Sequence, residues 1–129
     1  MKIIKYRHVI LLALIAAVMS SCYYDEVIKA EENIDVGEVT FSNDIIPIFN
    51  QSCNVSGCHA RGGQKPDLSP ENAYNSLING NYVNVDSPEN SELYLWVKGE
   101  NALPMPPSGS DATINANILA WIEQGALNN

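Results

Sequence analysis

Two cysteines and a histidine stand close together in the middle of the chain, in the stretch Cys53-Asn54-Val55-Ser56-Gly57-Cys58-His59. Four residues separate the cysteines, and the histidine directly follows the second of them. Such side chains are scarce elsewhere, because the 129 residues hold only three Cys, three Met and two His. Thiols and imidazoles bind metals and cofactors, so this stretch carries the most specific chemical signal of the chain.

The order Cys, Cys, His is the one that holds a c-type haem. The two thiols add to the vinyl groups of the porphyrin, and the adjacent imidazole is thereby brought under the iron. The usual motif has two residues between the cysteines, so the four residues here must form a wider loop. Gly57 supplies backbone freedom for that loop. The motif therefore favours covalent haem attachment.

Three other interpretations of the same residues stay open at this point. Cys53 and Cys58 can form a disulfide in an oxidising compartment. A structural zinc site needs a fourth N, S or carboxylate ligand, and the sequence after residue 22 holds no further Cys or His. A redox-active dithiol normally has two residues between its cysteines.

A methionine lies in a proline-rich loop, Leu103-Pro104-Met105-Pro106-Pro107. Three prolines exclude a regular helix and restrict the backbone. A methionine more often fills gaps in a core, but core filling does not require a rigid loop. A thioether opposite an imidazole is the ligand pair expected of an electron-transfer haem. Met105 thus favours haem over the disulfide.

The N-terminus has the pattern of a secretory signal peptide over residues 1–21. Three basic residues precede eleven consecutive apolar residues at positions 9–19, fewer than the ~20 needed to cross a bilayer. The following Ser20-Ser21-Cys22 resembles the lipobox of bacterial lipoproteins, in which the cysteine is acylated and begins the mature chain. We expect a lipid on Cys22 and an exported protein at the periplasmic side of a membrane, the outer membrane or the cell surface. The alternative is an ordinary signal peptide followed by an incidental cysteine.

Removal of the first 21 of 129 residues would leave an acidic chain of 108 residues. Four basic residues then stand against all 15 acidic ones, which changes the net charge from −8 to −11. This charge argues against nucleic-acid binding, which depends on clustered Lys and Arg. It predicts docking on basic patches of partner proteins, with association that slows as salt rises. Residues 22–40 are acidic without a sustained apolar period and are expected to form a flexible tether between membrane and domain.

Apolar spacing and capping residues predict about four short helices in residues 41–129, an all-α domain. The first has Asp44 as its N-cap and leads into Cys53. The others are expected over about 70–80, from 88 or 92 to 99, and from a cap at Asp111 or Thr113 to Gly125. Residues 82–85 could form a short extended piece, but no convincing strand pattern exists.

Taken in their order along the chain, the expected helices, the Cys-His motif and the methionine loop resemble the small class I cytochrome c domains of bacterial lipoproteins, in the subgroup with four residues between the haem cysteines. The resemblance rests on four segments within residues 41–129: residues 41–50, the motif 53–59, the loop 103–107 and residues 118–126. It implies an all-α cytochrome c-like domain around one covalent haem c. It also implies that Cys53 and Cys58 form the thioethers, that His59 is the proximal iron ligand and that Met105 is the distal ligand.

The resemblance further implies an electron carrier that is anchored to a membrane and meets redox partner proteins. Both axial positions of the iron are filled, and no catalytic base and nucleophile are seen, so no stand-alone enzyme is expected. One alternative is a haem-binding accessory or sensor module of a larger redox complex, in which a small molecule displaces Met105. The other is a disulfide-stabilised binding domain without haem.

The size of the domain also bears on folding. About 90 residues give a marginal core, so the protein without haem is expected to be poorly folded. The tryptophans at 96 and 121, with Tyr74 and Leu93, are expected to pack in the core or around the haem. Arg61 and Lys65 either pair with haem propionates or lie on the solvated surface.

Overall fold

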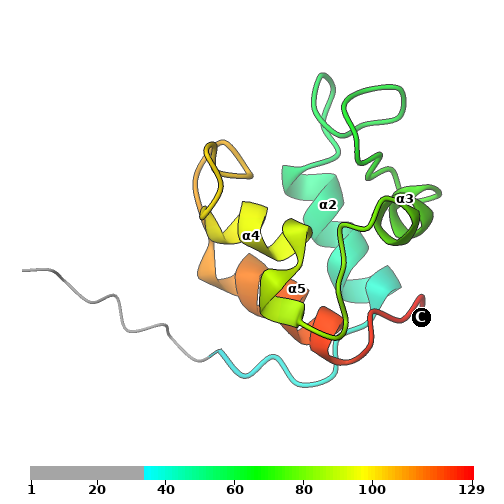
Figure 1. The fold of residues 1–129 in the computed structure, drawn as a ribbon. Coiled ribbons are helices and arrows are strands. Elements are labelled where there is room, and N and C mark those ends of the chain that lie inside the picture. Colours follow the sequence, from blue (N-terminus) through cyan, green and yellow to red (C-terminus); the bar gives the residue numbers. More distant parts are fainter. Residues whose placement is uncertain (1–33) are drawn as a thin grey trace, which may run out of the picture. The chain divides into compact units, whose positions relative to one another are not determined.

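The computed structural model describes residues 34–129, which contain four α-helices and no strand (Figure 1). The helices are α2 (Ile46–Ser52), α3 (Ala73–Asn79), α4 (Glu92–Lys98) and α5 (Ala112–Glu123). A π-helical turn, η1 (Phe41–Ile45), runs directly into α2, and a 3₁₀ turn, η2 (Pro88–Asn90), precedes α4. The expected all-α class with about four short helices is confirmed. None of the helices in residues 34–129 has the length and apolar character needed to cross a bilayer.

The expected signal peptide and Cys22 lie outside the described residues, as does the tether up to residue 33. The remainder of the expected tether, residues 34–40, is described. Within it Val39 is only 3% exposed and belongs to the core. The packed part of the chain therefore begins before Phe41.

The first helical segment, η1 followed by α2, begins one turn earlier than the sequence predicted, and its N-cap is Thr40 and not Asp44. The Thr40 hydroxyl accepts a hydrogen bond from the Asn43 N–H at 3.3 Å. Asp44 reaches back and accepts from the backbone N–H of Thr40 at 2.7 Å and from its hydroxyl at 2.8 Å. These hydrogen bonds lower the pKa of the Asp44 carboxyl. The reciprocal arrangement resembles a capping box and satisfies donors that the helix leaves unpaired.

The hydrogen bonds of η1 reach back five residues, as in a π-helix. The Ile46 N–H donates to the Phe41 carbonyl, and the Ile45 N–H donates to the Thr40 carbonyl at 3.3 Å. Pro47 follows in the first turn of α2, where its missing N–H costs little.

The second helix begins later than predicted, at Ala73 and not at Pro70. Asp67 accepts hydrogen bonds from the Ser69 backbone N–H at 3.0 Å and from the Ser69 hydroxyl at 2.6 Å. The side chain of Asn72 also donates to Asp67, at 3.1 Å. These bonds hold residues 69–72 in a separate turn, and those from Ser69 are the main cause of a lowered pKa for the Asp67 carboxyl. The helix ends at Gly80, as expected.

The last two helices follow their sequence signals. Ser91 precedes α4, which ends at Gly99 with φ +84°, a conformation that glycine adopts without strain. At α5 the Asp111 carboxylate accepts from the backbone N–H groups of Thr113 at 2.9 Å and Ile114 at 3.0 Å. Of the two caps that the sequence allowed, Asp111 is the one used.

Aromatic side chains form the centre of the core, where η1, α2 and α5 meet. The ring centroid of Phe41 lies 5.1 Å from Trp121, 5.3 Å from Tyr74 and 6.3 Å from Phe49. Trp121 is 1% exposed, and its indole N–H donates to the Leu127 carbonyl at 2.9 Å. The expected core role of Trp121 is confirmed, and the first and last helices contact each other through it.

Replacement of Trp121 by Ala is expected to lower the free energy of unfolding by about 3–5 kcal/mol, because a large buried side chain is lost and leaves a cavity. Denaturant titration of the purified full-length protein measures this loss. Val85→Ala, at a side chain that is 50% exposed, is the control and should change stability by less than about 0.5 kcal/mol. Equal effects of the two substitutions would contradict the packing described here.

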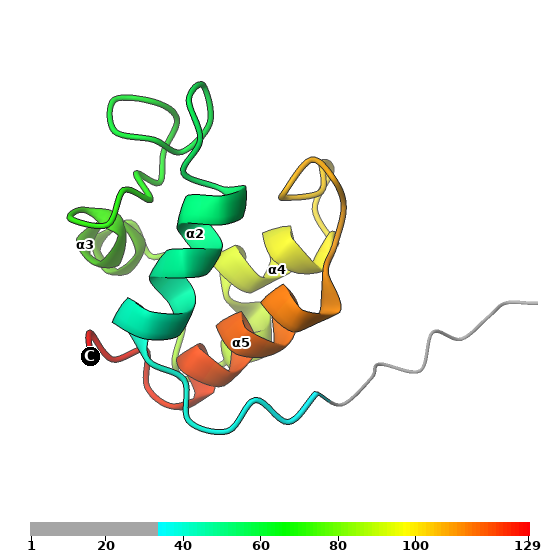
Figure 2. The same ribbon diagram turned by 180° about the vertical axis from the view of Figure 1, so that it is seen from behind.

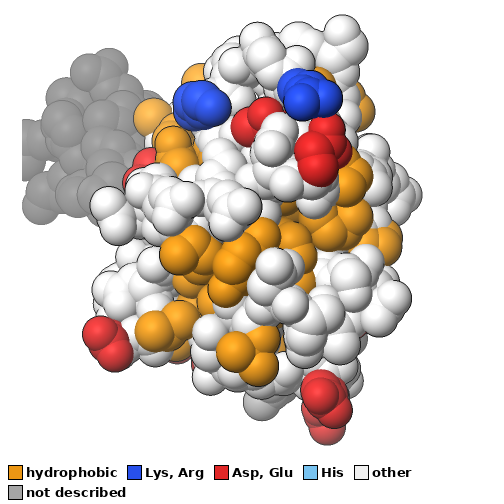
Figure 3. Space-filling view, turned by 90° about the vertical axis from the view of Figure 1, so that its right-hand side faces the viewer, with side chains coloured by type: hydrophobic (Ala, Val, Ile, Leu, Met, Phe, Trp, Pro, Cys, Tyr) orange, Lys and Arg blue, Asp and Glu red, His pale blue; other side chains and the backbone are white. Residues whose placement is uncertain are grey.

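Two long loops rise from the same end of the helices: residues 53–72 after α2 and residues 99–111 between α4 and α5. Figures 1 and 2, which view the molecule from opposite sides, both show the two loops at this end. Both also show residues 34–40 running along the opposite end. Figure 3 shows one side of the molecule, where hydrophobic side chains reach the surface across the middle of the face and the visible Lys and Arg groups lie at its upper edge.

Candidate haem site

The residues of the Cys-His motif form a closed loop immediately after α2. The His59 N–H donates back to the Cys53 carbonyl at 3.2 Å, and the Cys58 N–H donates to the Val55 carbonyl at 2.9 Å. Gly57 lies between the two cysteines and has φ +86°, in the left-handed region of backbone angles that residues other than glycine rarely adopt. The four residues between the cysteines are thus accommodated by a turn that uses the glycine, as the sequence suggested.

The two thiols of the motif lie near each other and are partly buried. Neither is in a disulfide. Burial raises the pKa of the Cys53 thiol to about 11, and the negative charge of the nearby Cys58 thiolate contributes to the rise. The loop therefore presents two free thiols, near enough for the charge of one to affect the other.

The imidazole of His59 is held by a backbone carbonyl. Its Nδ1 lies 2.9 Å from the carbonyl oxygen of Pro66. A carbonyl only accepts hydrogen bonds, so Nδ1 of the neutral ring carries the proton, and Nε2 keeps a free lone pair. This arrangement of one nitrogen on a carbonyl and the other available is typical of histidines that ligate metals. The backbone of His59 is fixed too, because its carbonyl accepts from the Leu68 N–H at 2.8 Å.

Gly63 is required where the loop folds back on the motif, and the sequence reasoning did not find it. A Cβ atom at this position would lie 2.4 Å from the Cys58 carbonyl oxygen and 2.9 Å from that of Ala60. The next residue, Gln64, donates its N–H to the same Cys58 carbonyl at 2.8 Å. The pair of adjacent glycines at 62 and 63 was a sequence signal for such a close approach.

Replacement of Gly63 by Ala is expected to displace the Cys58 backbone. It should lower both the free energy of unfolding and the amount of haem attached to the thiols. The overpacked side chain should cost about 1–3 kcal/mol of unfolding free energy. Denaturant titration and the haem content per chain measure the two effects. Gln64→Ala, at an exposed neighbour, should change neither. A Gly63→Ala protein with normal stability and haem content would show that the approach is not tight.

Met105 lies in the second loop, at the same end of the helices as the motif. Its side chain is partly buried, and its N–H donates to the Trp96 carbonyl at 3.3 Å. The indole N–H of Trp96, itself only partly buried, donates to Glu92 at 3.4 Å. Leu103, two residues before it, is 64% exposed, so Met105 is the more covered of the two apolar side chains.

Asn115 fastens the end of the Met105 loop and was not found from the sequence. In the amide orientation that satisfies both ends, its oxygen accepts from the Ser110 hydroxyl at 2.8 Å. Its nitrogen donates to the carbonyls of Val97 at 3.0 Å and Asp111 at 3.2 Å. One side chain on α5 thus ties the loop to α4.

The two basic side chains near the motif lie on the surface. Arg61 forms an ion pair with Glu71 at 3.5 Å, and the two side chains are 77% and 54% exposed. Lys65 is exposed as well. A pair as exposed as Arg61 and Glu71 contributes little to stability.

The structure brings Cys53, Cys58 and His59 together in one loop and places Met105 in a separate loop at the same end. In residues 34–129 no three side chains of His, Cys, Asp or Glu are grouped to hold a metal ion. Such a search does not address haem, because the porphyrin supplies four nitrogens and the protein only two ligands. Comparison of the chain with family models, curated proteins and solved structures gives no match.

Proposed function

We propose that this protein is a c-type cytochrome that carries single electrons and is anchored to a membrane through a lipid on Cys22. Residues 41–129 would form a cytochrome c-like domain that holds one covalent haem. Cys53 and Cys58 would form the thioethers, His59 would bind the iron on one side, and Met105 would bind it on the other.

The observation that carries this proposal is the environment of His59. Its Nδ1 is committed to the Pro66 carbonyl, so the ring is fixed and its Nε2 stays free to bind. The ring directly follows two free, neighbouring thiols in the same closed loop. A disulfide-stabilised domain would have no need of an oriented imidazole beside its cysteines. The donor set fits a haem that is attached through two sulfurs and one nitrogen.

The chain's own residues would decide what this site does. Bound there, a haem c supplies an iron that changes between Fe(II) and Fe(III). The thiols would prevent its loss, the Pro66 carbonyl keeps the His59 ring in place, and the Trp96 carbonyl positions the Met105 backbone. With His59 and Met105 both holding the iron, no ligand position would remain for a substrate, and a methionine ligand would raise the potential relative to two histidines. The proposed result is a carrier and not an enzyme.

The charge distribution supports docking on other proteins and argues against nucleic-acid binding. Residues 34–129 hold 11 acidic and three basic side chains, and two of the three basic ones, Arg61 and Lys65, lie in the loop after α2. The segments 45–66 and 101–110 contain no Asp or Glu. Partners with basic patches would be attracted by the acidic body, and high salt would slow their association.

The test is a pyridine haemochrome spectrum together with the intact mass of full-length protein that has been produced with a haem-attachment machinery. The expected result is one covalently bound haem per chain. A reduced protein that does not bind CO would support the carrier, whereas ready binding of CO would support a sensor. A mass without haem would overturn the proposal and favour the disulfide domain.

A further inference from the structure

The loop that carries Met105 runs from the end of α4 to the start of α5, over residues 99–111. Asn115, in the first turn of α5, fastens the end of this loop. We propose that Asn115 is a positioning residue for the distal ligand, which holds Met105 at the iron and thereby keeps small molecules from binding there. The inference rests on the proposed function, because Met105 is a ligand only when a haem is bound.

The side chain of Asn115 connects three parts of the chain. Its oxygen accepts from the hydroxyl of Ser110, in the loop, at 2.8 Å. Its nitrogen donates to the carbonyl of Val97, in α4, at 3.0 Å and to the carbonyl of Asp111, the N-cap of α5, at 3.2 Å. Asn115 is partly buried and Val97 is 3% exposed, so water has limited access to these hydrogen bonds. One amide therefore holds the end of the loop against α4.

The last turn of α4 offers three successive carbonyls to the loop. Carbonyls in the last turn of a helix lack the N–H groups of a following turn, so they can accept from elsewhere. The carbonyl of Leu95 accepts from the Glu100 N–H at 3.1 Å, and that of Trp96 accepts from the Met105 N–H at 3.3 Å. The third, that of Val97, accepts from the amide described above. The start, the methionine and the end of the loop are thus each held by one carbonyl of α4, directly or through that amide.

The segment between Met105 and α5 is exposed in its middle, at residues 107–108. Its internal hydrogen bond joins the Gly109 N–H to the Pro106 carbonyl at 2.9 Å. The bond from the Met105 N–H to α4, at 3.3 Å, is longer than the usual distance of about 2.9 Å. Exposed segments with few buried contacts open locally at a low cost in free energy. Asn115 therefore has a large share in keeping this segment closed.

Release of Met105 would open the iron to other ligands. A small molecule binds only the fraction of the protein in which the methionine has left the iron, so its apparent affinity rises in proportion to that fraction. The hydrogen bonds of the Asn115 amide to the loop and to α4 would together change this fraction about tenfold. Asn115 would thus set how well the carrier resists conversion into a haem protein that binds small molecules.

The experiment titrates the oxidised full-length haem protein with imidazole and follows the loss of the weak red absorption of the Met–iron bond. The imidazole nitrogen replaces the Met105 sulfur on Fe(III), and the oxidation state does not change. We expect Asn115→Ala to bind imidazole about tenfold more tightly than the wild type. Asn115→Asp keeps the shape of the side chain, but its carboxylate cannot donate to the Val97 carbonyl, so it should bind imidazole as tightly as Asn115→Ala.

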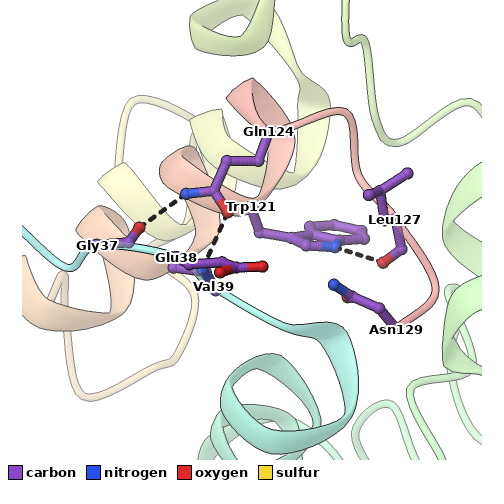
Figure 4. A pocket seen from close by; sticks show the side chains of 7 residues that line it. All are labelled: Gly37, Glu38, Val39, Trp121, Gln124, Leu127 and Asn129. Carbon is purple, nitrogen blue, oxygen red and sulfur yellow. Dashed lines mark hydrogen bonds between the residues drawn. The ribbon is translucent and has the colours of Figure 1, made fainter.

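Gln124→Ala is the matched control for a general loss of stability. Gln124 lies at the other end of α5, and its amide accepts from the Val39 N–H at 2.9 Å and donates to the Gly37 carbonyl at 2.8 Å (Figure 4). Loss of these two bonds should lower the free energy of unfolding, measured by denaturant titration, about as much as Asn115→Ala does. The affinity for imidazole should nevertheless keep its wild-type value, because the Met105 loop is untouched.

Asn117→Ala is the control for removal of an asparagine from the same helix. The Asn117 side chain donates to the Thr113 carbonyl within α5 at 2.9 Å, so its loss should leave the affinity for imidazole unchanged. Hydrogen exchange at the Met105 N–H is measured in the same proteins. It should become faster in Asn115→Ala and stay unchanged in both controls.

The outcomes separate the inference from the proposed function. A haem protein in which Asn115→Ala has the wild-type affinity for imidazole would overturn the inference alone, as would equal gains in Asn115→Ala and Gln124→Ala. A wild type that carries haem but lacks the red absorption would overturn the assignment of Met105 and the inference with it. A protein without haem would overturn the proposed function, and exchange at the Met105 N–H would still show whether Asn115 holds the loop.

Discussion

Replacement of both Cys53 and Cys58 by Ser is expected to leave the protein with no covalently bound haem. The two thioethers are the only bonds proposed to make the attachment irreversible, and a serine hydroxyl does not form them. The haem content, measured by pyridine haemochrome and intact mass, should fall from one per chain to none. Each single substitution should leave one thioether and a lower yield.

Cys22→Ser is the matched control for this experiment. It removes the remaining cysteine of the chain and should remove the lipid while the haem stays in place. If the double variant kept its haem through denaturation, the thioether assignment would be wrong. If Cys22→Ser also lost its haem, the roles of the three cysteines would have to be reassigned.

Replacement of Met105 by Ala is expected to open the second axial position of the iron. The protein should keep its haem, because the thioethers and His59 are unchanged, but the weak absorption of the Met–iron bond at the red end of the spectrum should disappear. The reduced form should then bind CO. The potential should fall by on the order of 0.1 V, a fraction of the range of ~0.8 V that axial ligands cover.

The control for this second experiment is Leu103→Ala in the same loop. Leu103 is exposed, so its loss should leave the red absorption, the CO behaviour and the potential unchanged. A Met105→Ala protein with the wild-type spectrum would show that another side chain is the ligand. Half-buried Trp96, which contacts the Met105 backbone, would then mark the region in which to search.

Helix ends were predictable from the sequence where a single local signal was enough. Gly99 and Gly125 end α4 and α5 with positive φ, and Asp111 caps α5, all through contacts within a few residues. The prediction failed where two signals competed. Asp44 could cap a helix, but Thr40 lies one turn earlier and uses Asp44 as its own partner. Ser69 could cap as well, but Asp67 engages it first.

The residues of the candidate site, too, were predictable only where the sequence signal is local. The motif, with Gly57 at its turn, can be read from seven consecutive residues. Gly63 and Asn115 could not be found, because each is set by a contact whose partner depends on the completed fold. A glycine that packs against a carbonyl, or an amide that hydrogen-bonds to backbone far away in the sequence, leaves no regular spacing by which the sequence could reveal it.

The hydrogen bonds of the motif loop have a consequence for the order of events during folding. Those that join His59 to Cys53, to Pro66 and to Leu68 connect residues at most nine positions apart. The core, by contrast, needs Trp121 to contact Phe41, and the segment before η1 needs Gln124 to contact Val39, 85 positions away. Local contacts form before distant ones, since little chain entropy is lost in closing them. The Cys-His loop can thus be arranged before the last helix has packed, and attachment of the proposed haem can precede the folding of the core.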